Sequence, residues 1–98
     1  MTDLCNEIEK FGRGIGNTSR YRIVEALFKG PRTVTQLVET VKQSQPLVSQ
    51  HLKTLKASSL VLDERRGKEV YYSLNSGYVV KLLKDLSKEI GQNKKHNK

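Results

Sequence analysis

The chain has 98 residues, which at about 150 residues per domain corresponds to one domain with no room for a separate catalytic lobe. Eighteen Lys and Arg against ten Asp and Glu give a formal net charge of +8, which favours a polyanion or an anionic surface as partner. The apolar runs are only a few residues long, whereas a membrane-spanning helix needs about 20, so we expect no spanning segment.

The first residues and the cysteine content point to a reducing compartment. Asp3 and Glu7 stand where a secretory signal would carry basic residues followed by an apolar stretch. The single cysteine, Cys5, permits no intrachain disulfide and no multi-thiol metal site. We therefore expect a cytoplasmic protein without a cofactor.

A first helix is predicted near the start of the chain. Leu4, Ile8 and Phe11 recur at i, i+4 and i+7 behind a possible Asp3 cap, so the helix should run to about Phe11. Three glycines within residues 12–16 then predict a flexible turn. This glycine run follows a helix and lacks the Gly-Lys-Ser/Thr ending of a phosphate-binding loop, so a nucleotide site is not indicated.

A second helix is predicted from Asn17 or Thr18 to the residues before Gly30-Pro31, a glycine–proline pair that is typical of a helix end. Its apolar positions are predicted to be buried. They are Ile23, Val24, Leu27 and Phe28.

Two further helices follow with only residues 42–43 between them. Thr33 and Gln36 form a capping-box pattern at the start of the third helix, whose apolar positions are Val34, Leu37, Val38 and Val41. Ser44 is the expected cap of the fourth helix, which should bury Val48, Leu52 and Leu55. Pro46 is tolerated there because first-turn amides have no partner within the helix. The pair is a helix-turn-helix.

From residue 60 the pattern changes to short β-branched and aromatic runs. Residues 60–62 and 69–74 flank Arg65-Arg66-Gly67-Lys68, which predicts a β-hairpin with a basic tip. A last helix should begin at Asn75 or Ser76. The fold class is therefore mainly α with a small β-hairpin (α+β), in one domain over residues 1–91. Residues 92–98 are basic and lack apolar side chains, so we expect a disordered tail.

The fourth helix carries the clearest functional signal. With its apolar residues turned inward, Gln45, Ser49, Gln50, Lys53 and Lys56 turn outward, and residues 44–62 contain no acid. Gln suits adenine, and Lys suits guanine or phosphate. A basic face without a partner is the alternative. The candidate DNA-binding residues are Ser44, Gln45, Ser49, Gln50, Lys53, Arg65, Arg66 and Lys68.

The basic hairpin tip has two interpretations. Its cations suit phosphate or minor-groove contact. They could equally be solubilising charges, because Asp63, Glu64 and Glu69 neutralise the segment.

Two apolar stripes predict a homodimer built from the first and last helices, in a chain too small to bury both. The candidate interface residues are Leu4, Ile8, Phe11, Val79, Leu82, Leu83, Leu86 and Ile90. The stripe of the last helix could also be plain core.

Several segments together resemble a known family. Residues 16–24, 35–38, 44–55 and 67–74 are similar to the ArsR/SmtB family of small bacterial and archaeal repressors. The resemblance extends from Phe11 to about Ile90. It implies a winged helix-turn-helix homodimer, assembled through its first and last helices, that leaves an operator when an inducer binds. By position, the implied DNA contacts are Gln45, Ser49 and Gln50, with Arg65 and Arg66 in the wing.

The chain departs from the family pattern at the metal sites. Metal-sensing members carry a Cys-containing motif at the start of the third helix, where this chain has residues 33–37 without a thiol. Others use carboxylate and His ligands on the last helix, at positions that fall here on Ser76, Tyr78, Glu89 and Gln92. Only Glu89 is a competent ligand. We predict no metal site and an unidentified, non-metal inducer.

Two other function classes compete with a repressor. A winged-helix module that sequesters another regulator would use the same fold without DNA. An enzyme would need a pocket of convergent titratable groups, and no spacing of Ser, His and Asp indicates one. His51 lies at the edge of the fourth helix's inner face and is interpreted as a packed histidine. We predict a transcriptional repressor that binds a palindromic operator, and not an enzyme.

Overall fold

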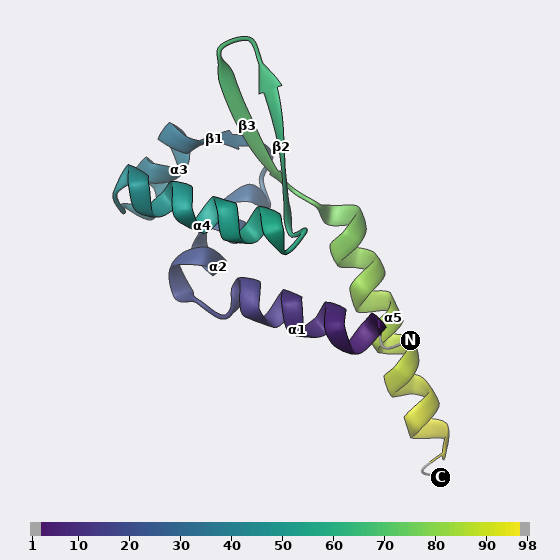
Figure 1. The fold of residues 1–98 in the computed structure, drawn as a ribbon. Helices are drawn as coiled ribbons and strands as arrows, with labels where there is room; N and C mark the ends of the chain where they lie inside the picture. Colours follow the sequence, from purple (N-terminus) through teal and green to yellow (C-terminus); the bar gives the residue numbers. More distant parts are fainter. Residues whose placement is uncertain (1–2, 97–98) are drawn as a thin grey trace.

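The structure is a computed structural model that describes residues 3–96, with side chains described for residues 4–91. Five helices and three short strands make up the fold (Figure 1). They are α1 (Asp3–Ile15), α2 (Thr18–Leu27), β1 (Arg32–Thr33), α3 (Val34–Val41), α4 (Gln45–Ala57), β2 (Val61–Arg66), β3 (Glu69–Leu74) and α5 (Ser76–His96). The predicted fold class is confirmed.

The core lies between α2, α3 and α4 and the start of β2. Its fully buried side chains are Ile23, Leu37, Val48, Leu52, Leu55, Leu60 and Val61. Each of the three helices contributes a stripe at the 3.6-residue period that the sequence shows. Side chains from α1, β3 and α5 pack against its edge, among them Phe11, Tyr72 and Val79. The elements from α2 to β3, here called the body, therefore form a complete core within one chain.

The predicted end of α1 at Gly12 is wrong, because the helix continues to Ile15 through two glycines. An added Cβ at Gly14 would lie 2.6 Å from Leu60 Cδ1, so a side chain at this position of α1 would collide with Leu60. Arg20 of α2 then caps the helix. Its Nε donates to the Gly14 carbonyl (2.7 Å) and its Nη2 to the Arg13 carbonyl (3.0 Å). Tertiary contacts thus outweigh the low helix propensity of glycine.

The start of α2 is as predicted, and the helix ends at Leu27, before Gly30-Pro31 as predicted. The Asn17 side chain caps the helix by accepting from the Arg20 amide at 3.1 Å. The predicted burial of Phe28 is wrong, since 59% of this residue is exposed. It is the C-cap residue, outside the helical stripe that carries Ile23 and Leu27 into the core.

The helix-turn-helix is confirmed. Both hydrogen bonds of the capping box are present, from the Gln36 amide to Thr33 Oγ1 (3.2 Å) and from the Thr33 amide to Gln36 Oε1 (2.9 Å). The turn passes through Lys42, which adopts the left-handed conformation at φ 57°. Ser44 then caps α4 by accepting from the Leu47 amide.

The sheet has one strand more than predicted. β1 pairs antiparallel with β3, and β3 pairs antiparallel with β2, in the order β1-β3-β2. A strand of two residues has no periodicity for a sequence to show. Arg32 and Thr33 form a strand only because Tyr72 and Tyr71 lie opposite them.

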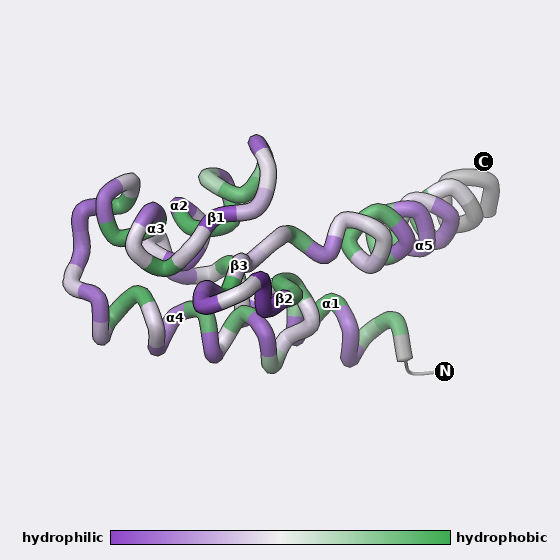
Figure 2. Tube along the Cα trace, turned by 90° about the horizontal axis from the view of Figure 1, so that it is seen from above, coloured by the Kyte–Doolittle hydropathy of each residue, from purple (hydrophilic) through white to green (hydrophobic). Residues whose placement is uncertain are grey.

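Helix α5 leaves the body at an angle and extends away from it (Figures 1 and 2). The predicted domain boundary at residue 91 falls inside α5, whose backbone continues through residues 92–96 of the expected tail. No Pro interrupts these residues, and Gln and Lys are good helix formers. Residues 97–98 lie outside the described part.

Candidate nucleic-acid interface

Helix α4 presents a polar face whose position is set by its apolar one. Val48, Leu52 and Leu55 are buried, and they turn Gln45, Gln50 and Lys53 into solvent. The candidate Ser49 is half-buried, and its Oγ accepts a hydrogen bond from Gln45 Nε2 at 3.2 Å. The candidate Ser44 holds the helix start. The outer face therefore offers amide and ammonium groups without a carboxylate.

The turn between α3 and α4 is fixed to the body by a side-chain contact. Gln43 Nε2 donates to Ser19 Oγ at the start of α2 at 2.8 Å. Because only two residues separate α3 from the Ser44 cap, this contact and the left-handed Lys42 determine the angle of α4. The polar face is thus carried on a rigid support.

The hairpin of β2 and β3 forms a wing that stands out from the body (Figure 1). Gly67, at φ 63°, makes the tight turn between Arg66 and Lys68, and both cations are exposed. The three wing candidates of the sequence are therefore brought together at one tip. They are Arg65, Arg66 and Lys68.

The two arginines of the wing lie on opposite faces, because side chains alternate along a strand. Arg66 stacks over the Tyr71 ring, with 4.7 Å between its Cζ and the ring centroid, and donates to Glu64 at 3.2 Å. Arg65 shares its face with Asp63, which accepts a hydrogen bond from Lys56 of α4 at 2.8 Å. Arg65 therefore lies on the face of the wing that α4 contacts, and Arg66 on the other.

The wing and α4 are linked by this ion pair. The hydrogen bond and the charge of Asp63 raise the pKa of the Lys56 ammonium. Lys56 was expected to face outward and is exposed, but its charge is directed to the wing. Sequence reasoning missed this pairing and the Arg66–Tyr71 stack. Strand alternation and the register of the hairpin could have indicated the stack.

His51 is buried on the inner side of α4, as expected for a packed histidine. Burial, followed by the nearby positive charge of Arg20, lowers the pKa of its imidazole. The ring is therefore neutral at pH 7. His51 lies where α4 packs against α2.

The predicted dimer residues divide into two groups. Phe11, Val79 and Leu82 are partly or fully covered within the chain, where Leu82 packs under α1. Leu4, Ile8 and Leu86 are half-buried, whereas Leu83 and Ile90 are 47% and 57% exposed. Val80, which the prediction did not include, is also 50% exposed. An apolar strip thus remains open along α5.

A polar contact joins α1 and α5 beside this strip. Tyr78 donates a hydrogen bond to the Glu7 carboxylate, which raises the pKa of Tyr78 to about 12. The family resemblance implied a metal-ligand position at Tyr78. In this chain the Tyr78 hydroxyl bonds to Glu7 of α1 instead. Within the described residues, no group of three or more His, Cys, Asp or Glu side chains could hold a metal ion.

Comparisons with known proteins identify the family of this chain. Residues 17–62, which contain the helix-turn-helix, match the family described as bacterial regulatory protein, arsR family. The crystal structure of NolR from Sinorhizobium fredii superposes with a TM-score of 0.70 at 34% identity, covering 89% of this chain and 87% of that one. The chain belongs to the arsR family.

One further relative of this arsR-family chain bears on its length, and one solved structure on its fold. The HTH-type transcriptional repressor SmtB of Mycobacterium tuberculosis is 39% identical over 80 residues, which is 82% of this chain and 59% of SmtB. This chain therefore spans less than two thirds of the length of that relative. A winged helix-turn-helix DNA-binding domain from Mycobacterium bovis has a TM-score of 0.74 at 24% identity, covering 95% and 86%, and shows the fold. The family consists of transcriptional regulators and not enzymes. None of the helices in the described part of this chain is long and apolar enough to cross a membrane.

Proposed function

We propose that the protein is a sequence-specific, double-stranded DNA-binding transcriptional repressor that acts as a homodimer on a palindromic operator. The observation that carries the proposal is the exposed, acid-free face of α4 beside a basic wing. A helix of this kind fits the major groove, which is about 12 Å wide. The relative SmtB is named as a transcriptional repressor, which supports a regulatory role.

In the proposed complex, α4 reads the sequence and the wing contacts the DNA backbone. Gln50 and Gln45 carry amides that can pair with the N6 and N7 edge of adenine, and Lys53 suits guanine or phosphate. Arg65 lies on the α4 side of the wing and is the best placed of the wing cations to contact phosphate. Ser49 and Ser44 then position Gln45 and the helix start.

The proposed dimer uses the open apolar strip of α5 together with α1. Leu83 and Ile90 are spaced by seven residues, and Leu86 lies between them on the same side of the helix. A second copy would bury this strip. Two recognition helices related by a two-fold axis would address half-sites about 34–36 Å apart, which requires a palindromic operator.

The signal that releases the repressor is proposed to be something other than a metal ion. Zinc sites use about four N, S or O donors in a tetrahedral set. Cys5, the single thiol, is exposed on α1, away from the start of α3, and Glu89, exposed on α5, is the one competent ligand among the four family positions of that helix. Two copies of Glu89 would make a poor site.

Selection of bound duplexes from a random pool tests the proposal. We expect a single imperfect palindrome, and Gln50→Ala should weaken binding to it by about 1–3 kcal/mol with little change on random DNA. Lys84→Ala, on α5, is the control for loss of a surface side chain. Failure to enrich any duplex, with salt-insensitive binding to a protein partner, would favour a protein-sequestering module.

A further inference from the structure

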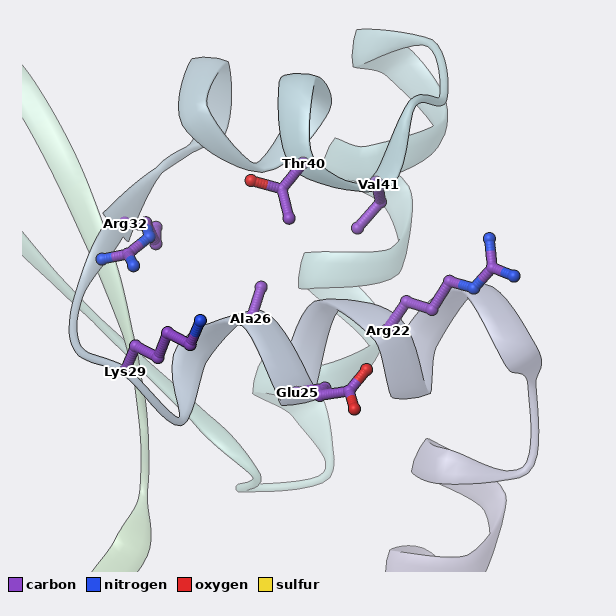
Figure 3. A pocket seen from close by; sticks show the side chains of 7 residues that line it. All are labelled: Arg22, Glu25, Ala26, Lys29, Arg32, Thr40 and Val41. Carbon is purple, nitrogen blue, oxygen red and sulfur yellow. The ribbon is translucent and has the colours of Figure 1, made fainter.

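A groove runs along the side of the body between α2 and α3. Its volume is about 540 Å³, within the range of small-molecule sites. Three of its lining residues come from α2, one from the turn that follows α2, one from β1, and two from the last turn of α3 (Figure 3). They are Arg22, Glu25, Ala26, Lys29, Arg32, Thr40 and Val41.

The charge of the groove is unevenly distributed. Figure 3 shows Lys29 and Arg32 at one end and Arg22 at the other, with Glu25, Ala26, Thr40 and Val41 between them. Glu25, the one carboxylate of the lining, is therefore outnumbered by three cations, and in the described part of the chain it forms no ion pair. Within the described residues, neither Lys29 nor Arg32 forms an ion pair.

The sheet fixes the backbone of Arg32, and the side chain makes one local hydrogen bond. Its backbone is paired with Tyr72 in the sheet, its side chain is half-buried, and its Nη1 donates to the Pro31 carbonyl at 3.1 Å. A guanidinium has five N–H donors in a planar fork, so most remain available for a second acceptor. A guanidinium near an ammonium is an arrangement that suits the oxygens of a phosphate group.

We propose that this end of the groove binds the phosphate of a small phosphorylated metabolite. Lys29 and Arg32 would hold the phosphate, and the rest of the molecule would lie over Ala26, Thr40 and Val41 toward Arg22. A second anionic group would meet Arg22. The site is independent of the proposed function, since none of the lining residues belongs to α4, β2 or β3.

The test is a titration of the protein with pyrophosphate, in phosphate-free buffer at about 0.15 M salt. Chemical shifts of the backbone amides, measured by NMR, report binding. We expect saturable shifts confined to α2, β1 and the end of α3. Lys29→Ala and Arg32→Gln should each weaken binding at least about tenfold. Arg32→Lys, which keeps the charge without the planar fork, should fall between Arg32→Gln and the wild type.

The control variant is Lys84→Ala, which removes the same charge as Lys29→Ala from an exposed position on α5. It should leave the pyrophosphate affinity within about twofold of wild type. Amide dispersion identifies any variant that fails to fold, and Lys29, which is exposed, gives the variant least able to disturb the core.

Two results would overturn the proposal. Unsaturable shifts spread over the basic surface, with equal losses for Lys29→Ala and Lys84→Ala, would mean counterion binding only. Shifts of the groove amides with a DNA duplex but not with pyrophosphate would mean that the groove contacts the nucleic acid backbone instead.

Discussion

The helix-turn-helix body and the α1–α5 pair use their apolar residues differently. In the body, Ile23, Leu37 and Leu55 are fully buried within the chain. On α5, Val80, Leu83 and Ile90 are each about half exposed, although their periodicity is just as regular. Regular spacing therefore shows which face of a helix is apolar, and does not show whether the same chain covers it.

Loss of the apolar strip should have the largest effect on function. Leu83→Glu places a charge in the proposed dimer interface, where its burial costs several kcal/mol. We expect monomer at tens of micromolar and a loss of operator affinity of about a hundredfold or more, measured by sedimentation and DNA binding. Because Leu83 is exposed in the single chain, Leu83→Glu should change the folding of the monomer little.

Lys88→Ala is the control, since it alters the net charge by the same amount on the opposite side of α5. A wild-type protein that sediments as a monomer at tens of micromolar would contradict the proposed dimer, and a Leu83→Glu dimer would exclude this strip as its interface.

The contact between α1 and the body can be tested at the glycines of α1. Gly14→Val adds side-chain atoms where Leu60 Cδ1 already lies within 2.6 Å of an added Cβ. We expect a loss of about 1–3 kcal/mol in the free energy of unfolding, measured with urea. Gly12→Ala meets nothing within 4 Å and should gain up to about 1 kcal/mol from helix propensity. Equal effects of the two changes would show that α1 does not pack as described.

The DNA contacts of the wing can be tested at its two arginines. Arg65→Ala should reduce the slope of log K against log salt by about 1 for each phosphate that the arginine neutralises, on specific and random DNA alike. Arg66→Ala should change the slope less, because Arg66 is stacked on Tyr71 and paired with Glu64. Binding isotherms at several salt concentrations measure both, and a larger change for Arg66→Ala would reverse the assignment.

The smallest effect is expected from pH at His51, where α4 meets Arg20. Because the pKa of the folded imidazole is lowered, the unfolded chain binds a proton more readily below about pH 6.5. Stability from this group is therefore present above that pH and is lost as the pH falls through the folded pKa. Thermal unfolding of His51→Gln should depend less on pH between 7 and 5 than that of wild type. An unchanged profile would mean that other groups dominate.

Local patterns were sufficient for most of the body. The Thr33–Gln36 capping box, the Ser44 cap and the burial of Val48, Leu52 and Leu55 depend on residues within one or two turns of each other. Helix caps and amphipathic stripes are short-range effects, so they can be predicted from neighbouring residues. The candidate residues of α4 are exposed for the same reason, with Ser49 half-buried.

Long-range contacts account for what the sequence did not predict. Strand β1 exists because β3 lies beside it, and the apolar Phe28 is exposed because α2 ends at Leu27. Which face of the wing lies toward α4 follows from the contact between Lys56 and Asp63. The groove between α2 and α3 joins residues from three elements, and no motif marks it.

The sequence by itself therefore determined the order of the elements, the helix-turn-helix, the basic wing and the polar face of α4, since each depends on spacing and side-chain type. Only the tertiary structure decided that α1 continues through Gly12 and Gly14. Glycine has a low helix propensity, and that cost is offset by partners distant in sequence, the Arg20 guanidinium on the last carbonyls and the close approach to Leu60.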